Sequence, residues 1–409
     1  MSFAPSIILP FAEARHTVEK HASAVASGAT ELLDLLDAAG RVLAEDIVAD
    51  RDFPPFPRAT RDGYAVRAED TATLPASLRL VGEIRAGASQ ADSAIELHSG
   101  EAVRIMTGAP VPSGSDAVVM VEYTSERDGK IEVHRSVASG ENFVPAGSEA
   151  RRDNLLLDRG TLLTESAVAV AASVGKARLH VRTRPSVAVL STGDEIVDVR
   201  VEPRTNQIRN SNSYSLATQI KAAGAVPVLL PVAPDEPVRL RQLIEEGLRS
   251  DLLLLAGGVS MGKYDLVEQV LVDLAAEFYF TGALIQPGKP IVFGRVRGKY
   301  FFGLPGNPVS TMVTFTLFAR PLIDALGGRK PQPLTFTHVR LKSDIRVKTG
   351  LTRFLPSMLT GEFEHAEVEL VNWQGSGDIA ATARANCYVV VPPDRERIAA
   401  GEWIAIIRK

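Results

Sequence analysis

Between residue 184 and about residue 328, the sequence repeats one pattern: a short apolar run, a glycine-containing loop and an amphipathic segment. The apolar runs, which predict strands, cover 185–191, 225–232, 250–257 and 299–305. The segments with helical spacing cover 215–224, 237–250, 264–277 and 308–327. Near-continuous apolar strands that alternate with helices are typical of a parallel sheet covered on both faces. The sequence therefore predicts a three-layer α/β domain with a mostly parallel sheet.

The sequence differs in character on both sides of this region. From about 26 to 180 it is rich in Gly, Pro and short β-type runs, and the runs at 77–87, 130–137 and 160–175 predict mostly β structure. After a linker at 331–336, four alternating segments predict a small terminal β-domain; they cover 337–347, 367–373, 387–393 and 402–409. Near the N-terminus, apolar residues fall on one helical face and predict a helix; they are Phe11, Ala14, Val18, Ala22 and Val25.

Length and charge limit the class of protein. A chain of 409 residues is too long to fold around a single hydrophobic core, and its length suggests about three domains. The net charge is −4 and no long basic run occurs, which argues against a nucleic-acid surface and favours small molecules or proteins as partners. The single cysteine, Cys387, excludes an internal disulfide. No signal-like N-terminus and no apolar run of membrane-spanning length is found, so we expect a cytoplasmic protein.

The segment GLPGNPVS links the fourth predicted strand to the last predicted helix. Asn307 suits the N-cap position, and Pro308 suits the first helical position, where its missing N–H costs nothing. The N–H groups of Val309, Ser310 and Thr311 would then point out of the helix start and attract an anion. A capped turn without a ligand is the commoner outcome, and the motif alone favours it.

Two further loops leave predicted strands at the same sheet edge, where ligands of open α/β sheets bind. The first contains Ser191, Thr192, Gly193, Asp194 and Glu195, and the second contains Gly257, Gly258, Ser260, Gly262, Lys263 and Asp265. The second loop resembles the start of a P-loop, but Tyr264 occupies the position where Ser or Thr must bind Mg²⁺. We therefore exclude a P-loop NTPase, although small residues with free N–H groups could still hold phosphate.

The acidic residues of these loops suggest a metal site. Asp194, Glu195 and Asp265 are all predicted at one sheet edge, and hard oxygen ligands suit Mg²⁺ that bridges phosphates. Each acid alone is more often a cap or a solvated turn residue. Their convergence with two glycine-rich loops favours a phosphorylated ligand with a metal ion.

Two motifs of the β-rich region remain ambiguous on local grounds. Asp62 has Arg58, Arg61 and Arg67 around it, and the sequence Asp-Gly there is compatible with a purely structural turn. Thr107 similarly follows a predicted strand. Composition gives no reason to assign a function to either motif.

Seven segments together are more specific than any one of them. They are DGYAVRAED, VRIMTGAPVPSGSDAVVM, VAVLSTGDEIVD, NQIRNSNSYSLATQIKAAGA, AGGVSMGKYD, QPGKPIVFG and GLPGNPVS. In order and spacing, over essentially the whole chain, the sequence resembles the MoeA type of molybdopterin molybdenumtransferase, a family that includes the gephyrin E-domain. The resemblance implies an enzyme of molybdenum cofactor synthesis. Such an enzyme takes adenylylated molybdopterin and molybdate, inserts the metal at the dithiolene and releases AMP with Mg²⁺ present.

The resemblance also implies an elongated homodimer of four-domain subunits. The expected boundaries are 1–25 with 181–329 for the α/β domain, 26–50 with 147–180 for a linking β domain, 51–146 for a β-rich inserted domain and 330–409 for a barrel-like terminal β-domain. Each cleft would lie between the α/β and terminal domains of one subunit and the inserted domain of the other. The molybdopterin adenylyltransferase and proteins of molybdoenzyme maturation are candidate partners.

Carried over residue by residue, the resemblance predicts the site. Its catalytic residues would be Asp62, Thr107, Glu195, Asp235 and Asp265, with Asp194, Glu195 and Asp265 as metal ligands. The expected substrate-binding residues are Ser191, Thr192, Gly193, Gly257, Gly258, Ser260, Gly262, Lys263, Lys289, Pro305, Gly306, Asn307, Ser310, Arg353 and Ser376.

The sequence departs from the family pattern at several positions near this site; they are Ala59, Arg61, Val144, Glu149, Gly282 and Gln286. These changes would leave Lys263, Lys289 and Arg353 to balance the charge of the substrate. Two alternatives remain: ATP-dependent adenylylation of molybdopterin, which uses a related α/β domain, and a non-catalytic pterin-binding scaffold. The sequence does not distinguish molybdate from tungstate as the substrate.

Overall fold

The computed structural model describes residues 6–26, 28–89, 94–258 and 266–409. By their contacts, these residues form two compact units. The first comprises Met1–Ala44, Gly160–Leu163 and Leu179–Lys409, and the second comprises Glu45–Arg159 and Thr164–Arg178. The division into four domains that the sequence suggests stays a prediction.

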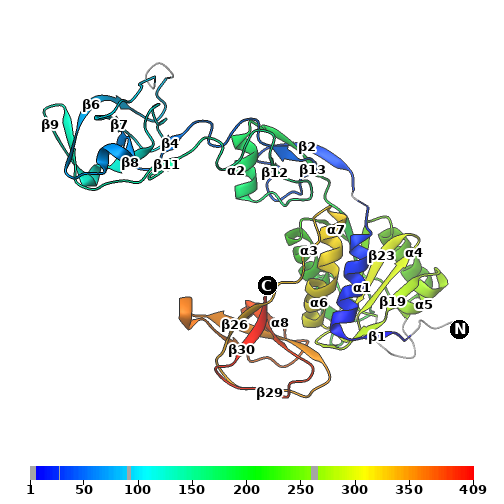
Figure 1. Ribbon diagram of the computed structural model, residues 1–409. Coiled ribbons are helices and arrows are strands. Elements are labelled where there is room, and N and C mark those ends of the chain that lie inside the picture. Colours follow the sequence, from blue (N-terminus) through cyan, green and yellow to red (C-terminus); the bar gives the residue numbers. More distant parts are fainter. Residues whose placement is uncertain (1–5, 27, 90–93, 259–265) are drawn as a thin grey trace. The chain divides into compact units, whose positions relative to one another are not determined.

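A six-stranded sheet forms the centre of the α/β part of the first unit (Figure 1). Its strands, in spatial order, are β17 (Val226–Leu229), β14 (Ser186–Ser191), β18 (Leu252–Ala256), β23 (Lys299–Leu304), β22 (Val292–Val296) and β19 (Glu277–Phe280). The first four strands are parallel, β22 pairs antiparallel with β23, and β19 pairs antiparallel with β22. The predicted α/β fold with a mostly parallel sheet is therefore confirmed, but β22 and β19 were not predicted.

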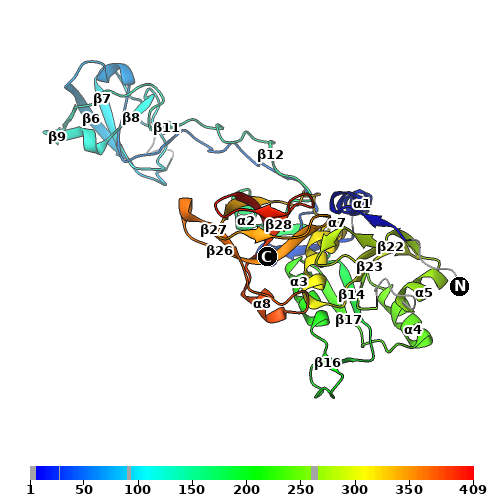
Figure 2. The same ribbon diagram turned by 90° about the horizontal axis from the view of Figure 1, so that it is seen from below.

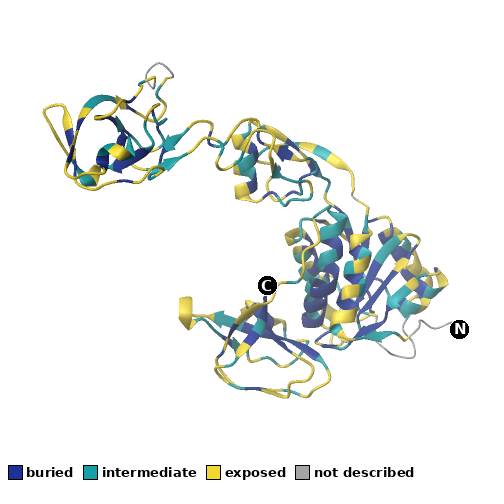
Figure 3. Ribbon diagram, viewed as in Figure 1, coloured by how far each residue is buried: buried dark blue, intermediate teal, exposed yellow. Residues whose placement is uncertain are grey.

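Helices cover both faces of this sheet. One core contains Leu252 and Leu254 of β18, together with apolar residues of α1 (Phe11–Ser23), α3 (Asn212–Ala222), α6 (Pro308–Thr314) and α7 (Arg320–Leu326). The other contains Leu253 and Leu255, together with residues of α4 (Pro237–Gly247) and α5 (Leu266–Asp273). Alternate side chains of one strand thus belong to two cores. Figure 3 shows the strands between the helices in the colour of buried residues. The predicted N-terminal helix is confirmed by α1, which buries Ala14, Val18 and Ala22.

The last helix of the α/β part is interrupted. A π-helical turn, Phe315–Ala319, joins α6 to α7, and Pro321 follows it. Pro321 has no N–H to donate to the carbonyl of Leu317, and that carbonyl accepts a hydrogen bond from the buried guanidinium of Arg15 instead. The continuous stretch Pro308–Leu326 is long and apolar enough to cross a membrane, so the prediction that no apolar run reaches this length is wrong. Its apolarity has a local reason, because most of it is buried inside this domain.

The terminal β-domain is a small closed barrel. Its strands pair in the order β26 (Thr352–Thr360), β27 (Glu367–Leu370), β24 (Thr337–Leu341), β30 (Trp403–Arg408) and β28 (Cys387–Val391), and β28 returns to β26. Figure 2 shows α8 (Ile379–Arg384) beside these strands. A short strand of the α/β part, β21 (Ile285–Gln286), pairs with β26 and so joins the two domains. The predicted barrel-like domain is confirmed.

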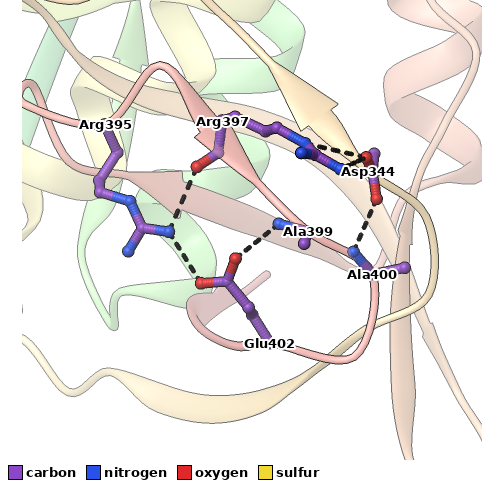
Figure 4. A network of polar contacts seen from close by, with 6 residues as sticks. All are labelled: Asp344, Arg395, Arg397, Ala399, Ala400 and Glu402. Carbon is purple, nitrogen blue, oxygen red and sulfur yellow. Dashed lines mark hydrogen bonds and ion pairs between the residues drawn. The ribbon is translucent and has the colours of Figure 1, made fainter.

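A polar network fixes the last turn of this barrel (Figure 4). The carboxylate of Asp344 accepts hydrogen bonds from the backbone N–H of Ala400, at 2.8 Å, and from the guanidinium of Arg397, at 2.7 Å. Glu402 similarly accepts from the N–H of Ala399 and from Arg395. The network thereby secures the pair of short strands β25 (Ile345–Arg346) and β29 (Arg397–Ile398).

Short pairings complete the first unit. They are β1 (Ile8–Leu9) with β20 (Gly282–Ala283), β2 (Thr30–Asp34) with β13 (Arg178–Arg182), and β15 (Ile196–Val197) with β16 (Ile208–Arg209). The β15–β16 ribbon extends away from the sheet (Figure 2).

The second unit is mostly β structure, as predicted. Its six-stranded sheet has the order β8 (Ala117–Met120), β5 (Gly63–Val66), β7 (Glu101–Ile105), β6 (Ala76–Ile84), β10 (Lys130–Val133) and β9 (Thr124–Arg127). Two-stranded pairings join β4 (Arg58–Ala59) to β11 (Phe143–Val144) and β3 (Ile47–Val48) to β12 (Leu155–Leu157).

The β-type prediction for 160–175 is wrong over most of its length. Glu165–Ser173 form the helix α2, and the hydroxyl of Thr164 caps it by accepting a hydrogen bond from the N–H of Ala167. The apolar run is rich in alanine, the strongest helix former, and this propensity together with the cap outweighs its alternating pattern.

Candidate active site

A cavity of about 730 Å³ lies at the carboxyl ends of β14, β18 and β23. The described residues that line it are Ser191, Thr192, Glu195, Ile196, Ile208, Arg209, Asn210, Ser211, Asn212, Ala256, Gly257, Gly258, Pro290, Pro305, Gly306, Asn307, Pro308, Gly377 and Ile379. The three predicted strand-end loops thus meet in one place, as expected for an open α/β sheet. Gly377 and Ile379 come from the terminal β-domain, so two domains of this unit form the walls.

The loop after β14 turns sharply at Gly193. The backbone N–H of Thr192 donates to Ala256 at 3.2 Å, and that of Gly193 donates to Ala233 at 3.2 Å. Gly193 has a φ of 129°, and a Cβ there would lie 2.5 Å from a carboxylate oxygen of Glu195. A glycine is therefore required for the carboxylate of Glu195 to fold back over the loop.

Three acidic residues concentrate negative charge beside this loop. Asp194 accepts a hydrogen bond from the backbone N–H of Asp235 at 3.1 Å. The pKa of Asp235 is raised, first by the loss of solvent around its carboxyl group and then by the negative charges of Asp194 and Glu195. Carboxyl groups gathered in this way suit a divalent cation with oxygen ligands. No cluster of three His, Cys, Asp or Glu side chains with metal-site geometry occurs among the described residues, and the third predicted ligand, Asp265, lies outside them.

The glycines after β18 allow close approach to Thr192. Gly257 and Gly258 have φ values of 95° and 62°. A Cβ on Gly258 would lie 2.6 Å from Oγ1 of Thr192 and 2.7 Å from Val267. The predicted residues Ser260, Gly262 and Lys263 of this loop also lie outside the described part of the chain.

The segment GLPGNPVS adopts the predicted turn but not the predicted contacts. Asn307 is the N-cap and Pro308 the first helical residue, yet the side chain of Asn307 donates to Oγ of Ser376 at 3.0 Å instead of capping the helix. The N–H of Val309 donates to the carbonyl of Ser376, and that of Thr311 donates to Asn307. The prediction of three free N–H groups is therefore wrong for Val309, because a turn of the terminal domain packs on the helix start, and for Thr311, because its N–H makes the first bond of the helix itself.

Ser310 and Ser376 remain close to this corner. Ser310 is buried, and its N–H has no hydrogen-bond partner among the described residues. The contact between Asn307 and Ser376 confirms that Ser376 adjoins the corner, although neither serine is among the described residues that line the cavity.

Of the three predicted cations, the two that the structure describes differ in their surroundings. Lys289 is exposed and its neighbour Pro290 lines the cavity. Arg353 is buried, and its guanidinium donates to the carbonyl of Lys348 within the terminal domain. Neither side chain is among the described lining residues, where Arg209 is the cation.

A polar network at the wall of the cavity connects the predicted Ser191 to Asn210 and Ser213, which were not among the predicted site residues. Oγ of Ser191 bonds to Oδ1 of Asn210 at 3.2 Å and to Oγ of Ser213 at 2.9 Å. Asn212 donates to the carbonyl of Gly306 at 2.7 Å and so links α3 to the corner. Oγ1 of Thr192 and Oδ1 of Asn212 are buried without a partner among the described residues, which makes them candidates for ligand contacts. The signal was the run of Asn and Ser residues at 210–213.

Asp62 and Thr107 form a pair in the second unit. One carboxylate oxygen of Asp62 accepts hydrogen bonds from the backbone N–H of Thr107, at 2.6 Å, and from its hydroxyl, at 2.9 Å. These bonds lower the pKa of Asp62. Both residues are exposed, and Gly63 packs so closely that a Cβ would lie 1.9 Å from the carbonyl oxygen of Val119. The contact fits a structural turn as well as a prepared functional pair.

The α/β sheet and the polar cavity at its strand ends lie in a region that matches a molybdopterin-binding class of domain. Residues 188–325 match the family described as "Probable molybdopterin binding domain". Residues 9–175 match "MoeA N-terminal region (domain I and II)", and residues 338–408 match "MoeA C-terminal region (domain IV)". The chain therefore belongs to the MoeA family of molybdopterin molybdenumtransferases.

Individual relatives agree with this assignment. The molybdopterin molybdenumtransferase of a Nostoc species is 34% identical over 93% of this chain and 88% of its own length. That of Haemophilus influenzae is 34% identical over 92% of this chain and 93% of its own length. The crystal structure of the molybdopterin biosynthesis MoeA protein from Pyrococcus horikoshii OT3 covers 98% of this chain and 100% of its own, with 28% identity and a TM-score of 0.77.

Proposed function

We propose that this protein is a molybdopterin molybdenumtransferase, which inserts molybdenum from molybdate into adenylylated molybdopterin and releases AMP. The main support for this proposal is that MoeA-type regions match on both sides of the α/β domain. The chain is therefore similar to the family along nearly its whole length. The cavity supports it chemically, since its backbone turns and polar side chains suit a phosphorylated ligand.

We assign the binding of the substrate to the strand-end loops. The glycine turns at 193, 257 and 306 bring main-chain groups to the cavity, and Arg209 supplies positive charge there. Thr192 and Asn212 each offer a buried oxygen without a described partner. A ligand with hydroxyl or amino groups could donate hydrogen bonds to these two oxygens. Its phosphate could bind the main-chain N–H groups and Arg209.

The acidic residues fit a magnesium ion, which is part of this proposal. Asp194 and Glu195 would hold it together with Asp265. The pKa of Asp235 is raised first by burial and then by the negative charges of Asp194 and Glu195, and a cation would offset these charges. When bound, the ion would supply charge stabilisation at phosphoryl oxygens. Asp62 or Asp265 would orient the water that attacks the anhydride.

We further propose a homodimer in which each cleft combines the cavity of one subunit with the Asp62–Thr107 pair of the other. This gives the exposed pair a role that its own surroundings do not explain. The buried free thiol of Cys387, with a pKa raised to about 11 by burial, fits a cytoplasmic location. An adenylyltransferase that supplies the adenylate would be the natural protein partner.

The decisive experiment is the release of AMP from adenylylated molybdopterin, titrated with molybdate and, in parallel, with tungstate. Molybdate-dependent release supports the proposal. Synthesis of the adenylate from ATP and molybdopterin would instead indicate an adenylyltransferase, which the full-length family match does not favour. Binding of the adenylate without any release stimulated by either oxyanion would indicate a scaffold.

A further inference from the structure

A second cavity, of about 330 Å³, lies at the other end of the helices that border the active cavity. Its lining includes Lys221 to Gly224 at the end of α3 and Arg320 to Gly327 along α7. Helix α3 reaches the active cavity through its first residue, Asn212. Because α3 has 11 residues, at about 1.5 Å rise per residue the two cavities are roughly 15 Å apart along it.

The lining of this second cavity is strongly basic. Its cationic residues are Arg41, Arg182, Arg184, Lys221, Arg320 and Arg329, and its acidic residue is Asp324. Asp324 is shared by Arg320, at 3.0 Å, and Arg329, at 3.6 Å. Arg41 is paired with Glu31. The carboxylates are therefore too few to balance the guanidinium and ammonium groups.

Two of these cations have no counter-charge within the described part of the chain. Arg184 and Lys221 are exposed and make no ion pair among the described residues. Arg182 donates to the carbonyl of Gly28, which is neutral. The ends of α3 and α7 carry partial negative charge, of about half a unit each, and so offset only part of this excess.

Arg41 offers an independent indication of a ligand. Its side chain is only 9% exposed, and its Nη2 donates to Glu31 and to the carbonyl of Arg182. Its Nε is buried and has no hydrogen-bond partner among the described residues. Buried N–H groups are normally paired, so Arg41, which lines this cavity, has a donor left for a ligand.

We propose that this basic cavity binds a small molecule that carries a phosphate or diphosphate group, at a site separate from the active cavity. The volume is at the lower end of the range of small-molecule sites, which suits inorganic phosphate, pyrophosphate or a nucleoside monophosphate. A guanidinium group can donate two parallel hydrogen bonds to the oxygens of one phosphate, and Arg41, Arg182 and Arg184 provide such groups.

The test is calorimetric titration of the full-length protein with phosphate, pyrophosphate and AMP in separate arms. The variant Arg184→Gln/Lys221→Gln removes the two unpaired cations, both exposed, and a thermal melt without ligand checks that it folds. Its matched control is Arg127→Gln/Lys130→Gln, which removes two exposed charges from the second unit.

We expect the Arg184→Gln/Lys221→Gln variant to bind at least one of the three ligands at least tenfold more weakly, and the control to bind like the wild type. The arm in which the Arg184→Gln/Lys221→Gln variant loses most affinity relative to the wild type identifies the preferred form of the phosphate group, because binding in the active cavity is common to both proteins. Equal affinities in both variants for all three ligands would overturn the proposal. Because the readout is binding, it is independent of whether AMP is released from the adenylylated substrate.

Discussion

Gly258 shows how a single residue limits the shape of the active cavity. Alanine there would have to adopt a φ of 62°, and its Cβ would clash with Thr192 and Val267. We expect Gly258→Ala to destabilise the protein by about 2–5 kcal/mol, from backbone strain and overpacking together. The control is Gly298→Ala, at a φ of 80° with open space around the Cβ, which should cost only about 1–2 kcal/mol. Thermal melting of both variants measures their loss of stability. Equal losses would show that the contact with Thr192 is unimportant.

Asp235 and Asp344 should affect stability with opposite signs. The raised pKa of Asp235 means that its ionised form is disfavoured in the folded state, so Asp235→Asn should raise the melting temperature at pH 7. The pKa of Asp344 is lowered, first by the N–H of Ala400 and then by Arg397, so Asp344→Asn should lower the melting temperature at pH 7.

Both effects should disappear in acid. The penalty at Asp235 is fully present above its folded pKa and fades as the pH falls through that value. The stabilisation at Asp344 is fully present above the unfolded pKa, near 4, and is lost as the pH falls through its lower folded value. Melting temperatures measured from pH 7 down to the acid range test this, and differences that do not change with pH would contradict it.

At the scale of elements, the interrupted helix α6–α7 depends on a side chain from α1. Arg15→Met keeps the volume but removes the donor to the buried carbonyl of Leu317, and we expect a loss of about 1–3 kcal/mol. Pro321→Ala restores a backbone N–H in the same helix. The double variant should therefore lose less than the Arg15→Met variant alone, by about 1 kcal/mol. Strict additivity of the two changes in thermal or urea unfolding would refute this link.

The elements that were predicted correctly are those whose pattern is local. The strand at 186–191 is a continuous apolar run that ends in a glycine loop, and its register beside β18 follows from the same pattern. Strands β19 and β22 were missed because they join the sheet by antiparallel pairing, which depends on distant segments. Helix α2 was read as β structure because its Ala-Val alternation hid a capped, alanine-rich helix.

The candidate site also has features that the local sequence predicts and features that depend on distant segments. The meeting of the loops after β14, β18 and β23 follows from strand direction alone, so their place at the cavity was predictable. The contact of Ser376 with Asn307 and Val309 was not, because it depends on how the terminal domain packs on α6. For Arg353, sequence resemblance suggested an anion contact, whereas the fold directs its guanidinium to the carbonyl of Lys348.

At the scale of the whole molecule, the proposed homodimer makes a specific prediction about complementation. Asp62→Asn and Glu195→Gln should each abolish molybdate-dependent AMP release, since one removes a carboxylate of the inserted domain and the other a carboxylate of the cavity. Co-expression of the two inactive chains under different affinity tags yields mixed dimers. If each cleft combines Asp62 of one subunit with Glu195 of the other, one cleft of a mixed dimer carries both substitutions and the other carries neither.

A random mixture of the two chains should then recover about a quarter of the wild-type activity, because about half of the dimers are mixed and each has one intact cleft. Purification through both tags should raise this to about a half. If Asp62 and Glu195 of the same subunit instead formed one cleft, every cleft would carry one substitution and no activity would return. The same preparation examined by light scattering gives the oligomeric state, so a monomer would be recognised directly and would rule out the shared cleft.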